Sequence, residues 1–131
     1  MNILVIEDNP SHLKLAHLVL SAAGNKVSDT ATAEQGLAAI QRDKPEVVLL
    51  DLKLPGSDGL SFVRKLKASP KTQDIRVVAV TAFPDLWGKA EALKAGCDAY
   101  IVKPIDTRSL ASDINKLSGA RRKPARKRKK A

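Results

Sequence analysis

Hydrophobic residues of this chain fall into short dense runs, separated by longer stretches in which they are spaced as on a helix. Four runs predict strands that are buried on both faces. They cover residues 3–6, 47–50, 77–80 and 99–102. A fifth and weaker run, at 27–31, predicts one more strand.

Between the runs, apolar residues recur every three or four positions, which is typical of helices packed on a core. Five strands alternating with five helices predict an α/β fold, with a doubly wound five-stranded parallel sheet. The repeating residues are Leu13, Ala16 and Leu20, then Ala33, Leu37 and Ile40, then Phe62, Val63 and Leu66, then Ala90 and Leu93, and finally Leu110, Ile114 and Leu117.

Residues that start and stop helices support these boundaries. Asn9 and Thr32 are suited to cap the first two helices, and Asp58-Gly59 is suited to turn the chain into the third. Pro84 is expected in the first turn of the fourth helix, where its missing N–H costs nothing. Glycines that are placed to end a helix are Gly24, Gly96 and Gly119.

Four of the predicted strands are followed by polar residues. Because the carboxyl ends of parallel strands meet at one edge of the sheet, where ligands of such folds bind, we expect these side chains to converge. Each alone has a simpler interpretation, as a helix-terminal acid, a turn former, a cap or a loop entry. Together they predict a chemical site made of Glu7-Asp8, Asp51, Thr81-Ala82 and Lys103-Pro104.

Length and cysteine content fit one domain in a reducing compartment. The chain has 131 residues, and five βα units need about 120. No run approaches the roughly 20 apolar residues of a membrane span, and the first residues enter a strand rather than a secretory signal. A single cysteine, Cys97, is expected to be a small packed residue rather than a reactive one. We therefore expect a cytoplasmic protein.

Positive charge is concentrated at the end of the chain. The formal net charge is +9, and residues 121–131 hold eight basic residues and no acid. The remainder is therefore close to neutral. A segment so charged and without an apolar face is expected to be disordered.

The ordered motifs resemble those of bacterial response-regulator receiver domains, the CheY-like family of two-component signalling. Besides the four strand ends, the segments 54–59 and 95–100 are similar to loops of that family. The resemblance covers residues 1 to about 118. It implies a flavodoxin-like receiver domain over 1–119, a disordered basic tail over 120–131 and, since no output domain follows, a stand-alone receiver.

The resemblance also implies a mechanism. Asp51 would accept a phosphoryl group from a phosphohistidine on a histidine kinase or phosphotransfer protein, in a Mg²⁺-dependent reaction. Asp8 and Asp51 would bind the Mg²⁺ directly, with Glu7 acting through water and the backbone carbonyl of Lys53 as a further ligand. The protein would then be a switch that assists its own phosphorylation and dephosphorylation, not an enzyme for a small substrate.

Further residues follow from the same resemblance. Lys103 would bridge the acids and then the phosphoryl oxygens, after a cis bond to Pro104 that such sites use. The hydroxyl of Thr81 and the amide of Ala82 would bind the phosphoryl group, and Tyr100 would turn from exposed to buried as the switch aromatic. A downstream protein would bind the face made by the fourth helix, fifth strand and fifth helix, with Trp87, Tyr100 and the polar side of 106–117.

Two other functions compete with this one. Phosphohydrolases with an aspartyl nucleophile place a second acid two positions later, where this chain has Lys53. A nucleic-acid or anionic-lipid binding module, acting through 121–131, remains the alternative. His12 and His17 lack the spacing of a helical metal pair and are expected at the surface or partly packed.

Overall fold

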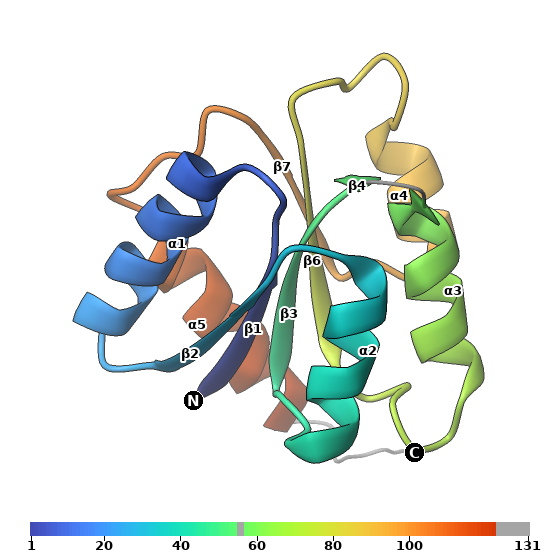
Figure 1. The fold of residues 1–131 in the computed structure, drawn as a ribbon, viewed down its shortest axis with the longest axis horizontal. Helices are drawn as coiled ribbons and strands as arrows, with labels where there is room; N and C mark the ends of the chain where they lie inside the picture. Colours follow the sequence, from blue (N-terminus) through green and yellow to red (C-terminus); the bar gives the residue numbers. More distant parts are fainter. Residues whose placement is uncertain (55–56, 123–131) are drawn as a thin grey trace.

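The computed structural model describes residues 1–54 and 57–122 and shows a parallel sheet between two layers of helices (Figure 1). The sheet has the strand order β2-β1-β3-β6-β7, all parallel. Its strands are β1 (Asn2–Ile6), β2 (Lys26–Thr30), β3 (Val47–Asp51), β6 (Arg76–Thr81) and β7 (Ala99–Val102). The helices are α1 (Pro10–Ala22), α2 (Ala33–Arg42), α3 (Gly59–Ala68), α4 (Lys89–Ala95) and α5 (Leu110–Arg122).

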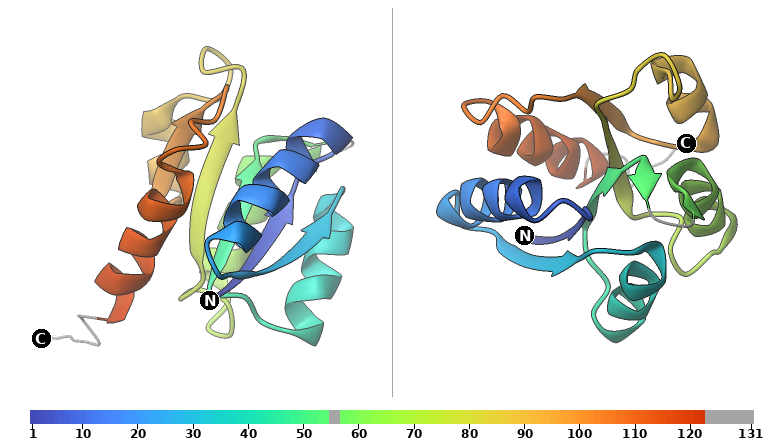
Figure 2. Two further views of the ribbon diagram at one scale, coloured as in Figure 1. Left: turned by 90° about the vertical axis from the view of Figure 1, so that its left-hand side faces the viewer. Right: turned by 45° about the horizontal axis from the view of Figure 1, so that its top comes forward.

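Side chains that alternate along each strand build a separate core on each face of the sheet. Leu4 and Ile6 of β1 pack with α2, α3 and α4, whereas Ile3 and Val5 pack with α1 and α5. Figures 1 and 2 show these two sets of helices on opposite sides of the strands. Every residue of β3 is buried, which explains why this strand reads as a continuous apolar run.

The predicted helix starts are confirmed by their capping contacts. Asn9 Oδ1 accepts hydrogen bonds from the backbone N–H groups of Ser11 and His12, at 3.0 and 3.1 Å. Thr32 and Asp58 cap α2 and α3 in the same way. Gly96 follows α4 with φ of +118°, a left-handed conformation that glycine adopts without strain.

Three predictions about the second half of the chain are wrong. Pro84 lies in a turn that starts at Phe83, whose carbonyl accepts from the N–H groups of Leu86 and Trp87, and α4 begins only at Lys89. Proline fits the second position of such a turn as well as it fits a first helical turn. α5 continues past Gly119 to Arg122, since one glycine weakens a helix by about 1 kcal/mol without breaking it.

The third error concerns the buried side of α4. Leu93 is 43% exposed, whereas Ala92 is fully buried and Ala95 packs against the core. Ala92 and Ala95 are three positions apart, as are Ala90 and Leu93, so periodicity alone does not choose between the two faces. A small antiparallel pair, β4 (Lys53–Leu54) with β5 (Ser57–Asp58), was not predicted at all.

Cys97 is 6% exposed, as expected for a packed residue, and burial raises the pKa of its thiol to about 11. Among the described residues, no helix is both long and apolar enough to span a membrane. The predicted disordered tail at 120–131 falls, from residue 123 onward, outside the described residues.

Candidate functional site

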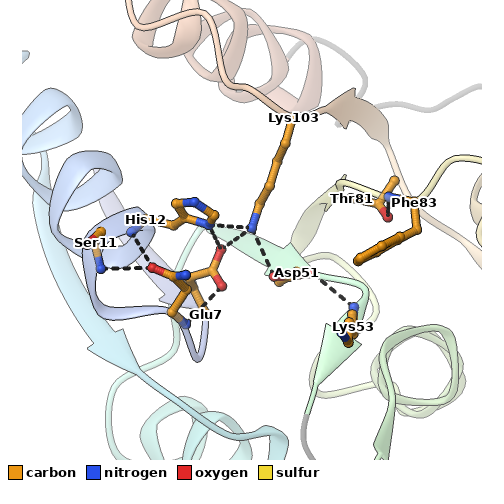
Figure 3. Close-up of polar contacts among 9 residues, drawn as sticks. Glu7, Ser11, His12, Asp51, Lys53, Thr81, Phe83 and Lys103 are labelled. Carbon is orange, nitrogen blue, oxygen red and sulfur yellow. Dashed lines mark hydrogen bonds and ion pairs between the residues drawn. The ribbon is translucent and has the colours of Figure 1, made fainter.

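The carboxyl ends of β1, β3, β6 and β7 bring the predicted polar residues to one edge of the sheet (Figure 3). Asp51 is the last residue of β3 and pairs in register with Val80, one residue before Thr81. The backbone N–H of Lys103 donates to the carbonyl of Thr81 at 2.8 Å, which continues the pairing of β6 with β7 into the site. The strand order therefore fixes which side chains meet.

Lys103 is the centre of the polar contacts at this edge. Its Nζ donates to Glu7 Oε1 at 2.6 Å and to Asp51 Oδ2 at 3.1 Å, and it lies 3.0 Å from His12 Nδ1. The side chain is only 11% exposed. Burial by itself lowers the pKa of Lys103, but the hydrogen bonds to Glu7 and Asp51 outweigh it, so the pKa is raised and the ammonium stays charged. The peptide bond from Lys103 to Pro104 is cis, as the resemblance implied.

Three carboxylates lie together next to this ammonium. Oxygens of Glu7, Asp8 and Asp51 are all within 4.8 Å of one another, with Glu7 and Asp51 buried and Asp8 exposed. Burial raises the pKa of Glu7 from 4.5 to about 7, although the hydrogen bond from Lys103 opposes the shift. The negative charge of Asp51 raises it further.

This cluster suits a divalent cation with a preference for oxygen. One ammonium does not balance three carboxylates. Burial raises the pKa of Glu7, and the nearby Asp51 adds to the shift, so the charged form of Glu7 is disfavoured at this place. Carboxylate oxygens with exposed positions left for water are what Mg²⁺ prefers, and the exposed Asp8 leaves one side of the cluster open. The residues therefore fit the metal that the sequence implied.

The side of Asp51 opposite Lys103 is held by backbone. The N–H of Lys53 donates to Asp51 Oδ1 at 2.9 Å, while the Lys53 ammonium lies 4.9 Å above the centre of the Phe83 ring. Thr81 is fully buried, and its Oγ1 accepts from the N–H of Phe83 at 2.9 Å. Ala82 lies between them in an exposed bend.

Tyr100 belongs to a second group of contacts, at the loop between β6 and α4. Its hydroxyl donates to the backbone carbonyl of Trp87 at 2.5 Å. Trp87 packs edge-on against Phe83, with ring centres 6.3 Å apart and an angle of 67°. Phe83 thus contacts both Lys53, next to Asp51, and Trp87, the partner of Tyr100.

The structure adds one residue that sequence reasoning did not assign to the site. His12 lies in the first turn of α1 and reaches Lys103, whereas His17 pairs with Asp29, with 2.8 Å between His17 Nδ1 and Asp29 Oδ1. The signal in the sequence is that His12 follows Glu7-Asp8 by only a few positions along the chain. Glu7-Asp8 come directly after β1, and His12 lies at the start of α1.

Comparisons with known proteins agree with this geometry. Residues 3–115 match the family model described as the response regulator receiver domain. The response regulator PleD of Caulobacter vibrioides is 34% identical over 116 residues, 88% of this chain and 26% of PleD. The polar-differentiation response regulator DivK of Brucella anthropi is 30% identical over 118 residues, 90% of this chain and 96% of DivK. The chain spans half or less of several relatives and nearly all of DivK.

Solved structures give the same picture. A CheY-like receiver domain protein from Methanospirillum hungatei JF-1 superposes with a TM-score of 0.85 at 30% identity, covering 92% of this chain and 95% of that one. The receiver domain of the sensor histidine kinase PA1611 from Pseudomonas aeruginosa PAO1 has a TM-score of 0.80 at 29% identity, covering 90% and 97%. That structure has a magnesium ion coordinated in its active site cleft.

Proposed function

The chain belongs to the response-regulator receiver domains of two-component signalling, and from that premise we propose that Asp51 is its phosphoryl acceptor. One observation carries the proposal. Asp51 ends the central strand, nearly buried, with one carboxylate oxygen facing the Lys103 ammonium and the other held by the Lys53 amide. Because these contacts hold both oxygens, the carboxylate has a fixed orientation from which it can act as a nucleophile.

In the proposed step, an Asp51 oxygen forms a bond to the phosphorus of a phosphohistidine on a histidine kinase or phosphotransfer protein. The bond from phosphorus to the donor's imidazole nitrogen breaks, and its electron pair stays on that nitrogen. The products are an acyl phosphate on Asp51 and a free imidazole on the donor. Water can later attack the same phosphorus and restore the carboxylate.

Charge is the main obstacle to this step, because both reactants are anionic. When bound, Mg²⁺ supplies positive charge that reduces the repulsion between Asp51 and the incoming group. Asp8 and Asp51 are proposed to hold the ion directly, Glu7 through water, and the Lys53 backbone carbonyl as a further oxygen ligand. The cluster of three carboxylates supports this assignment.

Two other groups are proposed to bind the phosphoryl oxygens. Lys103 already contacts Asp51 and needs only a short movement of its ammonium. The hydroxyl of Thr81 accepts from Phe83 and so retains its own proton for donation, and the amide of Ala82 follows it in the chain. Drawing this loop toward Asp51 would strain the contact between Phe83 and Trp87.

That movement is the proposed switch. The Tyr100 hydroxyl donates a hydrogen bond to the Trp87 carbonyl. Displacement of the loop therefore changes the position that the tyrosine ring can adopt. A phosphoryl group adds a charge of about −1.5 to −2 at neutral pH and shifts the equilibrium by its different contacts in the two states. We propose that a downstream protein reads the change on the face made by α4, β7 and α5, that the chain turns over no small substrate, and that it works in the cytoplasm.

Intact mass measurement tests the acceptor. Wild type incubated with phosphoramidate, whose P–N bond resembles that of phosphohistidine, should gain one phosphoryl group when Mg²⁺ is present and far less in excess EDTA. Asp51→Asn should gain none, because an amide is a poor nucleophile. Circular dichroism of the variant controls for folding, and equal labelling of both proteins would overturn the proposal.

We also propose a weak polyanion-binding role for residues 121–131, supported by their eight basic residues. Truncation after Arg122 leaves α5 whole and removes six of them. Full-length protein should bind duplex DNA at low salt, with a log–log salt slope of about −0.9 per phosphate contact, and the truncated form should bind much less. Undiminished binding by the truncated form would exclude this role.

A further inference from the structure

We infer that His12 is a positioning residue for Lys103: its imidazole accepts the third hydrogen bond of the Lys103 ammonium and so sets where that ammonium stands beside Asp51. The two nitrogens are 3.0 Å apart. The consequence for phosphoryl transfer rests on the proposed function, whereas the hydrogen bond itself is a property of the unphosphorylated protein.

Donor and acceptor counting gives His12 its role. An ammonium has three N–H donors and no acceptor, and two of its donors are used by Glu7 Oε1 at 2.6 Å and Asp51 Oδ2 at 3.1 Å. His12 Nδ1 must therefore be the acceptor, which places the imidazole proton on Nε2. The alternative pairing of His12 Nδ1 with Glu7 Oε1 spans 3.8 Å, too long for a hydrogen bond.

A closed ring of contacts fixes where the imidazole stands. Glu7 Oε2 accepts from the backbone N–H of Asn9 at 3.1 Å, and Asn9 Oδ1 accepts from the backbone N–H of His12 at 3.1 Å. His12 then contacts Lys103, which returns to Glu7 (Figure 3). The cap that starts α1 thus also places His12 over the site, and the ring joins the first turn of α1 to the segment after β7.

Charge explains why a neutral acceptor is useful at this point. Glu7 and Asp51 attract the ammonium as acidic groups, whereas an imidazole acceptor holds it without adding another anion beside the incoming phosphoryl group. The hydrogen bond to His12 therefore holds Lys103 on its α1 side, while its two ionic contacts remain free to rearrange. Glu7 and Asp51 are the carboxylates that contact this ammonium, and Asp8 belongs to the same cluster of acids.

The expected effect of losing this contact is graded. A hollow of about 230 Å³, lined by His12, Leu15, Lys103, Pro104 and Ile105, opens on this side. Water that enters it would satisfy the third N–H of Lys103 but would not fix its direction. Because the His12 side chain is 48% exposed, water competes for this hydrogen bond, and we expect about a three- to tenfold slower transfer.

The second histidine of α1 provides an internal control. His17 Nδ1 lies 2.8 and 2.9 Å from the two carboxylate oxygens of Asp29. A carboxylate only accepts, so His17 Nδ1 must donate. The same ring atom therefore has opposite roles in His12 and His17, five positions apart on one helix.

Imidazole ¹⁵N NMR of the full chain tests the hydrogen bond directly, at about pH 8.5, where a free imidazole is neutral. His12 Nδ1 should show the shift of an unprotonated nitrogen and His17 Nδ1 that of a protonated one. Lys103→Met should move the His12 nitrogens and leave His17 unchanged. Protonation of His12 Nδ1 in wild type, or its indifference to Lys103→Met, would overturn the inference.

Labelling rates with phosphoramidate and Mg²⁺ test the consequence. His12→Leu should be about three- to tenfold slower than wild type, whereas His12→Asn, whose Oδ1 falls near the place of Nδ1, should be within about twofold, as should His17→Leu. Equal rates for His12→Leu and wild type, or equally slow His12→Leu and His12→Asn, would overturn the positioning role. Failure of wild type to label would instead overturn the proposed function, with the NMR result still deciding the hydrogen bond.

Discussion

The Lys103 ammonium and the Glu7 carboxylate lie 2.6 Å apart although 96 positions separate them in the chain. Both side chains are about nine-tenths buried. The pair joins the loop after β1 to the segment after β7, the first and last strands of the chain that border the site. Lys103 also contacts Asp51 at 3.1 Å, so its ammonium keeps one charged partner when Glu7 is neutral.

Glu7→Gln should stabilise the protein at high pH. Burial raises the pKa of Glu7 from 4.5 to about 7, so between these pH values the folded state keeps a proton that the unfolded chain has lost. The contribution of Glu7 to the free energy of unfolding therefore falls as pH rises from 4.5 to 7 and is constant above. Without Mg²⁺, the free energy of unfolding of the variant should exceed that of wild type by about 1–3 kcal/mol at pH 8 and by little at pH 4.5.

Urea denaturation in EDTA across this pH range measures the difference. Glu34→Gln, which alters an exposed carboxylate of α2, is the matched control and should show no such gain. A difference between Glu7→Gln and wild type that does not grow with pH would contradict the assignment.

Mg²⁺ affinity should respond in opposite directions to two substitutions. Asp8→Ala removes a proposed ligand and should weaken binding by about tenfold or more. Lys103→Met removes a positive charge that contacts Glu7 and Asp51 and should strengthen binding by about threefold or more. Titration calorimetry measures both, and unchanged affinity in Asp8→Ala would exclude its role as a ligand.

Tyr100→Phe should loosen the loop between β6 and α4. The lost hydrogen bond to the Trp87 carbonyl predicts a loss of about 0.5–1.5 kcal/mol in the free energy of unfolding. Trp87 is the only tryptophan, so its emission reports the loop and should shift in the variant. Stability and emission both equal to wild type would show that the contact does not hold the loop.

Much of the site was predictable because parallel strands end at a common edge. Short apolar runs located β1, β3, β6 and β7, and the residues after them had to meet once the sheet was parallel. Strand order brings Glu7, Asp51 and Lys103 to the same edge of the sheet, where their side chains contact one another. The roles proposed for these residues in phosphoryl transfer stay predictions.

The errors arose where geometry depends on how a helix is rotated or where it starts. Pro84 suits a turn and a first helical turn equally, and the side of α4 that is buried depends on two alanines rather than on Leu93. His12 was missed for the same reason: its contact with Lys103 requires the direction that the Asn9 cap gives to α1. Spacing along the chain carries none of this information.

The acceptor can be located by reducing the phosphorylated protein with borohydride, which converts an aspartyl phosphate to homoserine and leaves free carboxylates unchanged. Wild type treated with phosphoramidate and Mg²⁺ should then carry homoserine at position 51, as identified by tandem mass spectrometry of its peptides. Untreated protein should carry none. Reduction at Asp8 or Glu7 in place of Asp51 would contradict the assignment of Asp51 as the acceptor. So would a phosphoryl group that remains on a residue of another type after borohydride treatment.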